Sequence, residues 1–235
     1  MAHRLPFNPN KKYRMKIKAI ITGATGMVGE GVLHECLQQA DVEKVLVINR
    51  KPCGVKHPKL TEIIHTNFFD LSPIENQLSS YNACYFCLGV SSVGMKEPEY
   101  TRFTHDLTLH VAKTLVKQNS DITFIYVSGS GTDSSEKGRV MWARVKGKTE
   151  NEILHLGFKK AYAFRPGFMR PTPGLKNVLG FYAFINWLYP TFRFLAPNLV
   201  STLAEVGVAM INVTNNGYPK SVLEVKDIVQ EAKAN

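Results

Sequence analysis

The stretch Ala19-Ile-Ile-Thr-Gly-Ala-Thr-Gly-Met-Val-Gly29 decides the fold of this chain. A short apolar run leads into Gly23, Gly26 and Gly29, which is typical of a buried strand that enters a tight turn. Apolar residues then recur at helical spacing as far as Leu37, so a helix follows. Because the first amides of a helix lack partners and glycine lets the backbone come close, this unit predicts a diphosphate site. The alternative is an ordinary turn whose small residues serve packing.

The next apolar run, Val45–Arg50, indicates which dinucleotide would bind. In this kind of unit the residue about 20 positions past the glycine turn meets the adenosine ribose. An acid there would hydrogen-bond a free 2′-hydroxyl, but this chain has none. The planar donor fork of Arg50 suits a phosphate, and Lys51 adds charge. The sequence therefore favours NADP(H) over NAD(H), the alternative being a solvated, charged strand end.

The composition fits one large α/β domain. The chain has 235 residues, of which 44% are hydrophobic and 20% charged. Its net charge of +10 can suggest a nucleic acid or an anionic membrane as partner, but no arginine–aromatic stripe accompanies it. We therefore name no nucleic-acid or membrane partner. We expect residues 1–14 to be a basic, disordered extension, residues 15–235 to be a single NAD(P)-binding domain, and residues 168–200 to form a substrate-side cap.

Strands and helices alternate along the rest of the chain. Further strands are predicted at Thr61–His65, Ala83–Leu88, Ile122–Val127, Lys160–Phe164 and Val222–Val225, with helices at Tyr100–Gln118 and Val140–Leu156 and a helix begun by the capping box Thr202–Glu205 that ends before Asn215. This alternation predicts a Rossmann-type, doubly wound parallel sheet with helices on both faces. Right-handed crossovers place all the strand ends, and hence the ligand, at one edge.

Four cysteines, Cys36, Cys53, Cys84 and Cys87, are too few and too scattered for a disulfide scaffold. Cys84 and Cys87 form a C-x-x-C pair, but it lies in an apolar run, so we interpret it as buried packing and predict no metal site. Free cysteines indicate a reducing compartment, most simply the cytoplasm.

The segment Val178–Leu195 is rich in aromatic residues and too broken to span a bilayer. Three interpretations compete for it. It is a cap helix over the sheet edge, an apolar surface for a second copy or a protein partner, or a shallow membrane attachment helped by the basic charge. The first is the simplest.

Five motifs occur in an order that resembles the short-chain dehydrogenase/reductase superfamily. They are Thr22-Gly-Ala-Thr-Gly-Met-Val-Gly29, Cys87-Leu-Gly89, Val127-Ser-Gly-Ser130, Val145-Lys-Gly147 and Arg165-Pro-Gly167. The chain is most similar to the atypical branch, near the Tat-interacting-protein oxidoreductases and the NAD(P)-dependent epimerase/dehydratase-like proteins. The resemblance covers roughly residue 15 to the end.

The resemblance implies a set of cofactor contacts along the sheet edge. Pyrophosphate contacts would come from Gly23, Thr25, Gly26, Met27, Val28 and Gly29; the 2′-phosphate would meet Arg50 and Lys51; and adenine would meet Asn67 and Phe68. The nicotinamide ribose would lie over Cys87, Leu88 and Gly89 and bond Lys146, with Arg165, Pro166 and Gly167 beside the carboxamide.

One position departs from the family pattern. Active members carry a tyrosine four residues before the lysine, on the same helix face, and the lysine charge lowers the pKa of the phenol. Here that position is Trp142, whose indole N–H has no useful acid–base equilibrium. Ser128 and Ser130 bracket the position of the catalytic serine, or else they form only a strand-end turn. Lys146 is a cofactor contact, or else a solvated helical lysine paired with Glu150.

Two functions therefore remain open. The first is an NADP(H)-dependent oxidoreductase or epimerase-like enzyme that acts on an unknown small carbonyl or hydroxyl compound, with Ser128, Ser130 and Lys146 as catalytic candidates. The second is a weak or inactive NADP(H)-binding regulatory protein, which Trp142 favours.

Overall fold

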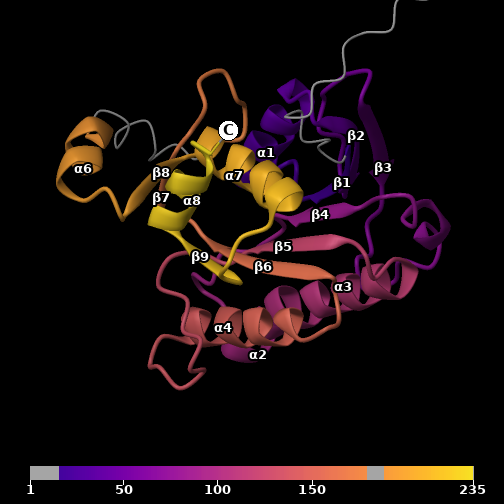
Figure 1. Ribbon diagram of the computed structural model, residues 1–235. Helices are drawn as coiled ribbons and strands as arrows, with labels where there is room; N and C mark the ends of the chain where they lie inside the picture. The colour runs from indigo at the N-terminus through magenta and orange to yellow at the C-terminus, as the bar shows by residue number, and fades with distance from the viewer. Residues whose placement is uncertain (1–15, 179–187, 235) are drawn as a thin grey trace, which may run out of the picture.

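Seven parallel strands form the central sheet, in the order β3-β2-β1-β4-β5-β6-β9 (Figure 1). The computed structural model describes residues 16–178 and 188–234. The strands are β1 (Ile17–Thr22), β2 (Val42–Asn49), β3 (Leu60–Ile64), β4 (Ala83–Phe86), β5 (Thr123–Val127), β6 (Lys160–Arg165) and β9 (Val222–Glu224). The strand order reverses between β1 and β4, and in such sheets the crevice beyond this point is where ligands bind. The predicted doubly wound α/β fold is confirmed.

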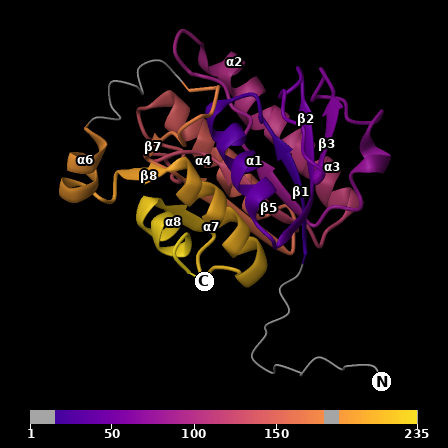
Figure 2. The ribbon, with the colours of Figure 1, turned by 90° about the horizontal axis from the view of Figure 1, so that it is seen from above.

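Helices cover both faces of the sheet (Figures 1 and 2). One face carries α1 (Met27–Gln38), α7 (Leu203–Asn216) and α8 (Val225–Glu231), and the other carries α2 (Glu97–Thr101), the π-helix η2 (Arg102–Asp106), α3 (Leu107–Gln118) and α4 (Met141–Leu154). A short 3-10 helix, η1 (Glu75–Gln77), precedes β4. Because both faces are covered, the central strands are apolar on both sides.

The two hydrophobic cores follow from the alternation of side chains along the strands. In β1, Ala19 and Ile21 belong to the core beneath α1 and α7, whereas Ile20 belongs to the core above α3. All three side chains are fully buried. The apolar run that predicted this strand is therefore the signature of a strand buried on both faces.

Helices α1 and α7 approach each other closely. A Cβ added to Gly31 would come within 2.9 Å of the Leu203 side chain, and one added to Gly207 within 2.7 Å of Glu35. The predicted capping box begins α7, since Thr202 Oγ1 accepts from the Glu205 amide at 3.0 Å and the Glu205 carboxylate accepts from the Thr202 amide at 2.8 Å. This packing holds α1, and with it the glycine turn, against the sheet.

Several elements differ from the sequence prediction. The helix expected at residues 100–118 is divided into α2, η2 and α3, and α7 extends through Asn216 rather than ending before Asn215. The sequence prediction also missed α8 and a small second sheet of β7 (Phe168–Arg170) and β8 (Val200–Thr202).

The described part of the predicted cap is α6 (Tyr189–Leu195), which projects from the body beside β7 and β8 (Figures 1 and 2). Arg193 of this helix donates to the Val200 carbonyl and pairs with Glu205, and the Arg170 guanidinium lies 5.2 Å from the centre of the Tyr189 ring. Tyr189 in the first turn of this helix is 6% exposed, whereas Phe194 in its last turn is 85% exposed. The role of α6 as a substrate-side cap stays a prediction. The predicted extension, residues 1–14, and residues 179–187 of the cap lie outside the described residues.

Candidate functional site

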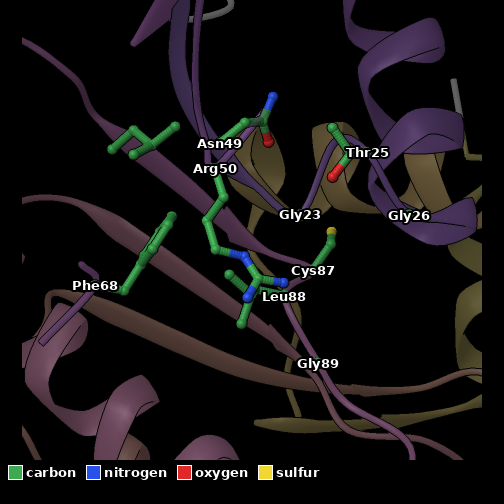
Figure 3. Close-up of a pocket in the computed structure, with 10 residues that line it drawn as sticks. Gly23, Thr25, Gly26, Asn49, Arg50, Phe68, Cys87, Leu88 and Gly89 are labelled. Carbon is green, nitrogen blue, oxygen red and sulfur yellow. The ribbon is translucent and has the colours of Figure 1, made fainter. Parts of the chain in front are cut away.

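A pocket of about 220 Å³ lies at the carboxyl ends of β1, β2 and β4, where the strand order reverses (Figure 3). Eight of the predicted cofactor contacts line it: Gly23, Thr25, Gly26, Arg50, Phe68, Cys87, Leu88 and Gly89. The structure therefore brings together the glycine turn, the end of β2 and the loop after β4, which are far apart in the sequence.

The glycine turn is shaped by close backbone approaches. Gly23 has a φ of 74°, and a Cβ there would lie 2.8 Å from both the Cys87 carbonyl oxygen and the Leu88 amide nitrogen. A Cβ on Gly29 would lie 2.2 Å from the Gly23 carbonyl oxygen. Only glycine leaves this cradle open. Gly26 caps α1 without a side-chain hydrogen bond, so the first turn of α1, with Met27 and Val28, presents backbone amides that suit a diphosphate.

Asn49 supports the turn, a role that the sequence prediction missed. Its Oδ1 accepts from the Ala24 amide at 3.2 Å, and its Nδ2 donates to Glu62 Oε1 at 3.1 Å. Glu62 Oε1 also accepts from the Cys53 amide at 2.8 Å. Asn49 is 2% exposed, and a buried amide at a strand end is the signal that could have indicated this role.

Arg50 extends from the end of β2 into the pocket, between Phe68 and Cys87 in the view of Figure 3. No carboxylate lines this pocket, and among the described residues Arg50 has no ion pair or side-chain hydrogen bond. Its guanidinium is thus free to meet an anion. Lys51 is exposed and does not line the pocket, so the structure separates the two predicted phosphate contacts.

A second cavity of about 210 Å³ adjoins the first and shares Arg50, Phe68, Leu88 and Gly89 with it. Asn67 also lines this cavity, and its Oδ1 accepts from the Phe69 amide at 3.1 Å. The two residues predicted to meet adenine, Asn67 and Phe68, therefore lie beside the end of β2. The cavity also contains Arg102, Phe103 and Leu107 from η2 and α3, which the sequence prediction did not include.

The catalytic candidates meet where β5 ends beside α4. Ser128 is 3% exposed and donates through Oγ to the Phe164 carbonyl at 3.1 Å, so its hydroxyl is held against β6. Ser130 is exposed; its backbone amide donates to the Pro166 carbonyl at 3.0 Å, and its hydroxyl has no hydrogen-bond partner among residues 16–178 and 188–234. Of the two serines, Ser130 is the one whose hydroxyl is accessible.

The Lys146 ammonium donates to the Ser128 carbonyl. Burial lowers the pKa of Lys146 to about 8, with Glu150 acting in the opposite direction. Glu150 is fully buried and bonds the Arg165 guanidinium instead of the Lys146 ammonium. The alternative of a solvated lysine paired with Glu150 is therefore wrong.

Trp142 lies one turn before Lys146 on α4. Its indole ring packs against the loop after β5, since a Cβ added to Gly131 would come within 3.4 Å of the ring. The position at which the family resemblance implies a tyrosine is therefore adjacent to the serine loop, but it offers an indole and no acidic hydroxyl.

At the Arg-Pro-Gly end of β6, the Arg165 side chain is engaged within the protein, whereas the predicted contacts of Pro166 and Gly167 with the carboxamide stay predictions. The Arg165 guanidinium bonds Glu150, Glu224 at 3.1 Å and Ser134 at 2.5 Å, and it lines neither of the two cavities. Gly167 lets the chain pass close to the residue that precedes β8, because a Cβ there would lie 2.2 Å from the Leu199 carbonyl oxygen. Arg165 is therefore a structural ion-pair residue in the described chain, and the Pro166 carbonyl anchors the serine loop.

The cysteines are unpaired thiols. Cys84 is buried, and Cys87 lines the first pocket, where burial raises its pKa to about 12 and keeps the thiol neutral. Within residues 16–178 and 188–234, no cluster of three or more metal-ligating side chains is present. In the same part of the chain, no helix has the length and apolar character that crossing a membrane needs.

The match to a protein-family model agrees with this geometry. Residues 19–138 match the model of the NAD dependent epimerase/dehydratase family, which is just over half of the chain. The chain belongs to this family. The predicted short-chain dehydrogenase/reductase resemblance is thereby confirmed, together with an NAD-type dinucleotide as the class of cofactor.

The chain is also similar to proteins named for mitochondria. It is 29% identical over 159 residues to "Protein fmp52, mitochondrial" of Emericella nidulans, which covers 63% of this chain and 65% of that protein. It is 28% identical over 155 residues to "Protein FMP52, mitochondrial" of Candida glabrata, covering 64% and 63%. The chain thus spans slightly less than two thirds of these relatives. Their names contradict the predicted cytoplasmic location. The prediction went wrong because free cysteines indicate reducing conditions but do not identify the compartment.

A solved structure shows the same fold. The chain superposes on Bordetella bronchiseptica WbmF in complex with NAD+ with a TM-score of 0.63 and 13% identity, covering 93% of this chain and 78% of that one. At this identity the likeness concerns the fold alone.

Proposed function

We propose that the protein is an NADP(H)-binding oxidoreductase of the atypical short-chain dehydrogenase type that acts on a small carbonyl or hydroxyl compound. The observation that carries this proposal is the unpartnered Arg50 guanidinium, in a pocket without carboxylates beside the glycine turn. A 2′-phosphate needs such a donor fork, whereas a free 2′-hydroxyl is usually bonded by an acid at this point of the fold. The similarity to the fmp52 proteins supports a mitochondrial location for this chain.

Different residues of the chain would bind the cofactor and polarise the substrate. The amides after Gly23 would hold the diphosphate, and the Lys146 ammonium would orient the nicotinamide ribose. When bound, the cofactor supplies or accepts a hydride. The exposed hydroxyl of Ser130 is the group we assign to polarise the substrate oxygen, because Ser128 already donates to the Phe164 carbonyl.

Cofactor binding tests the proposal directly. Calorimetry with NADPH and NADH should show tighter binding of NADPH to the wild type. Removing a charge-assisted donor costs about 1.5–3 kcal/mol, so Arg50→Ala should weaken NADPH binding roughly tenfold or more and leave NADH within about twofold. Lys56→Ala removes one charge from the exposed loop after β2 and is the matched control. Equal loss of both nucleotides in Arg50→Ala would refute the assignment of the phosphate.

Trp142 favours a second candidate, an NADP(H)-binding protein without turnover that acts through an interaction. Its indole lies beside the serine loop, at the sequence position where the family resemblance implies the catalytic phenol. NADPH oxidation against a panel of carbonyl compounds separates the two functions. Turnover that is lost in Ser130→Ala and Lys146→Ala supports the enzyme. Tight NADPH binding without turnover, together with activity that arises only in Trp142→Tyr, supports the binding protein.

A further inference from the structure

The cavity that adjoins the diphosphate pocket contains a second arginine from another part of the fold. Arg50 reaches it from the end of β2, and Arg102 reaches it from η2. No aspartate or glutamate lines this cavity. Two guanidinium groups therefore lie at one cavity of about 210 Å³ without a neutralising carboxylate in its walls, which is an arrangement that suits an anion of more than one charge.

Arg102 is oriented without using its hydrogen-bond donors. Its guanidinium carbon lies 5.4 Å from the ring centroid of Phe69 and 5.6 Å from that of Phe103. The two rings are themselves 6.4 Å apart and tilted by 60°. Contact with ring faces fixes the position of a guanidinium and leaves its N–H groups free. Among the described residues, Arg102 has no ion pair or side-chain hydrogen bond.

Three arginines elsewhere in the described part of the chain are already neutralised. Arg144 pairs with Glu97 at 2.7 Å, and Arg193 pairs with Glu205 at 2.5 Å. Arg165 bonds two carboxylates. Arg50 and Arg102 differ from these three because their donors are unsatisfied and because both face the same cavity.

The π-helix explains how Arg102 comes to line the cavity. The Leu107 amide donates to the Arg102 carbonyl, which is an i to i+5 bond. Residues five apart in such a turn lie about one turn apart, so Arg102 and Leu107 share a face. In an α-helix the same separation would turn the two side chains about 140° from each other. The π turn therefore lets Arg102 line the same cavity as Leu107, whose side chain also belongs to the core, and turns of this kind are frequent at functional sites.

We propose that Arg102 is a second specificity residue, which clamps the adenosine 2′-phosphate from the side opposite Arg50. This proposal rests on the proposed NADP(H) function. The phosphate carries close to two charges and three acceptor oxygens, so one fork satisfies it only in part. Arg50 supplies one guanidinium from the end of β2, and Arg102 supplies the other from η2, which lines the second cavity.

The test uses fragments that differ only in the phosphate, adenosine 2′,5′-bisphosphate and 5′-AMP, along with NADPH and NADH. Calorimetry on Arg102→Ala should show at least tenfold weaker binding of the bisphosphate and of NADPH, with AMP and NADH within about twofold. Arg102→Lys keeps the charge but not the fork and should lie between Arg102→Ala and the wild type. Phe69→Leu, which removes one supporting ring, should cause a smaller loss confined to the phosphorylated ligands.

The control is Lys117→Ala, which removes one positive charge from the far end of α3, about 20 Å along the helix, and should leave every affinity unchanged. An equal loss of AMP and bisphosphate binding in Arg102→Ala would mean that Arg102 stacks on adenine, and no loss would mean that it binds neither group; either result overturns the proposal. The two hypotheses separate through Arg50→Ala. If Arg50→Ala weakens NADPH binding more than NADH binding and Arg102→Ala does not, only the role of Arg102 is refuted. If neither substitution weakens NADPH binding selectively, the proposed NADP(H) function is refuted as well.

Discussion

Replacing Gly23 with alanine should destabilise the fold by an amount that the geometry of the turn determines. Gly23 has a φ of 74°, a conformation that costs an L-residue roughly 1–2 kcal/mol. The added Cβ would also lie 2.8 Å from the Cys87 carbonyl oxygen and the Leu88 amide nitrogen, both of them backbone atoms that cannot rotate away. Overpacking of this kind costs roughly 1–3 kcal/mol. The expected loss in the free energy of unfolding is therefore about 2–5 kcal/mol.

Two further glycines separate the two contributions. Gly157 has a φ of 88° with open space around its Cβ position, so Gly157→Ala measures the backbone cost alone. Gly89 lines the same pocket, has open space and no positive φ, so Gly89→Ala should change the stability by less than about 0.5 kcal/mol. Urea denaturation of the three variants without nucleotide gives the comparison. If Gly23→Ala costs no more than Gly157→Ala, the close approach between the glycine turn and the loop after β4 is refuted.

Three further predictions concern the supports of the site. Thr202→Ala removes the cap of α7 and should cost about 1 kcal/mol in urea denaturation, whereas an unchanged midpoint would contradict the capping box. Glu150→Gln leaves the buried Arg165 without its main partner and should cost about 3–5 kcal/mol; a loss below about 1 kcal/mol would show that Glu224 alone suffices. The pKa of Lys146 falls from 10.5 to about 8 on folding, so the folded state releases this proton first. The penalty is complete below pH 8 and disappears as the pH rises toward 10.5, so the wild type should gain stability relative to Lys146→Met over that range in thermal melts, and a difference that does not change with pH would contradict the shift.

The sequence was sufficient for the sheet and for the glycine turn. Buried parallel strands are continuous apolar runs, and a glycine turn between a strand and a helix is a local pattern, so residues 17–38 could be assigned without the structure. The Thr202–Glu205 capping box is equally local and was confirmed. Local signals of this kind do not depend on what packs against them.

Arg165 shows where the sequence was insufficient. Its place at a strand end indicated a cofactor contact, but its partner Glu150 lies on α4 and its partner Glu224 lies 59 residues further on. Nothing local reveals a buried ion pair of that separation. The same holds for Arg102, because the π turn that directs it into the cavity interrupts a helix whose sequence resembles an ordinary amphipathic one.

A crystal structure of the protein with bound NADP+ would show directly whether Arg50 binds the 2′-phosphate. We expect the diphosphate on the amides that follow Gly23 and the 2′-phosphate within hydrogen-bonding distance of the Arg50 guanidinium. A nucleotide that binds elsewhere, or one whose 2′-phosphate points to solvent while Arg50 stays unengaged, would contradict this expectation.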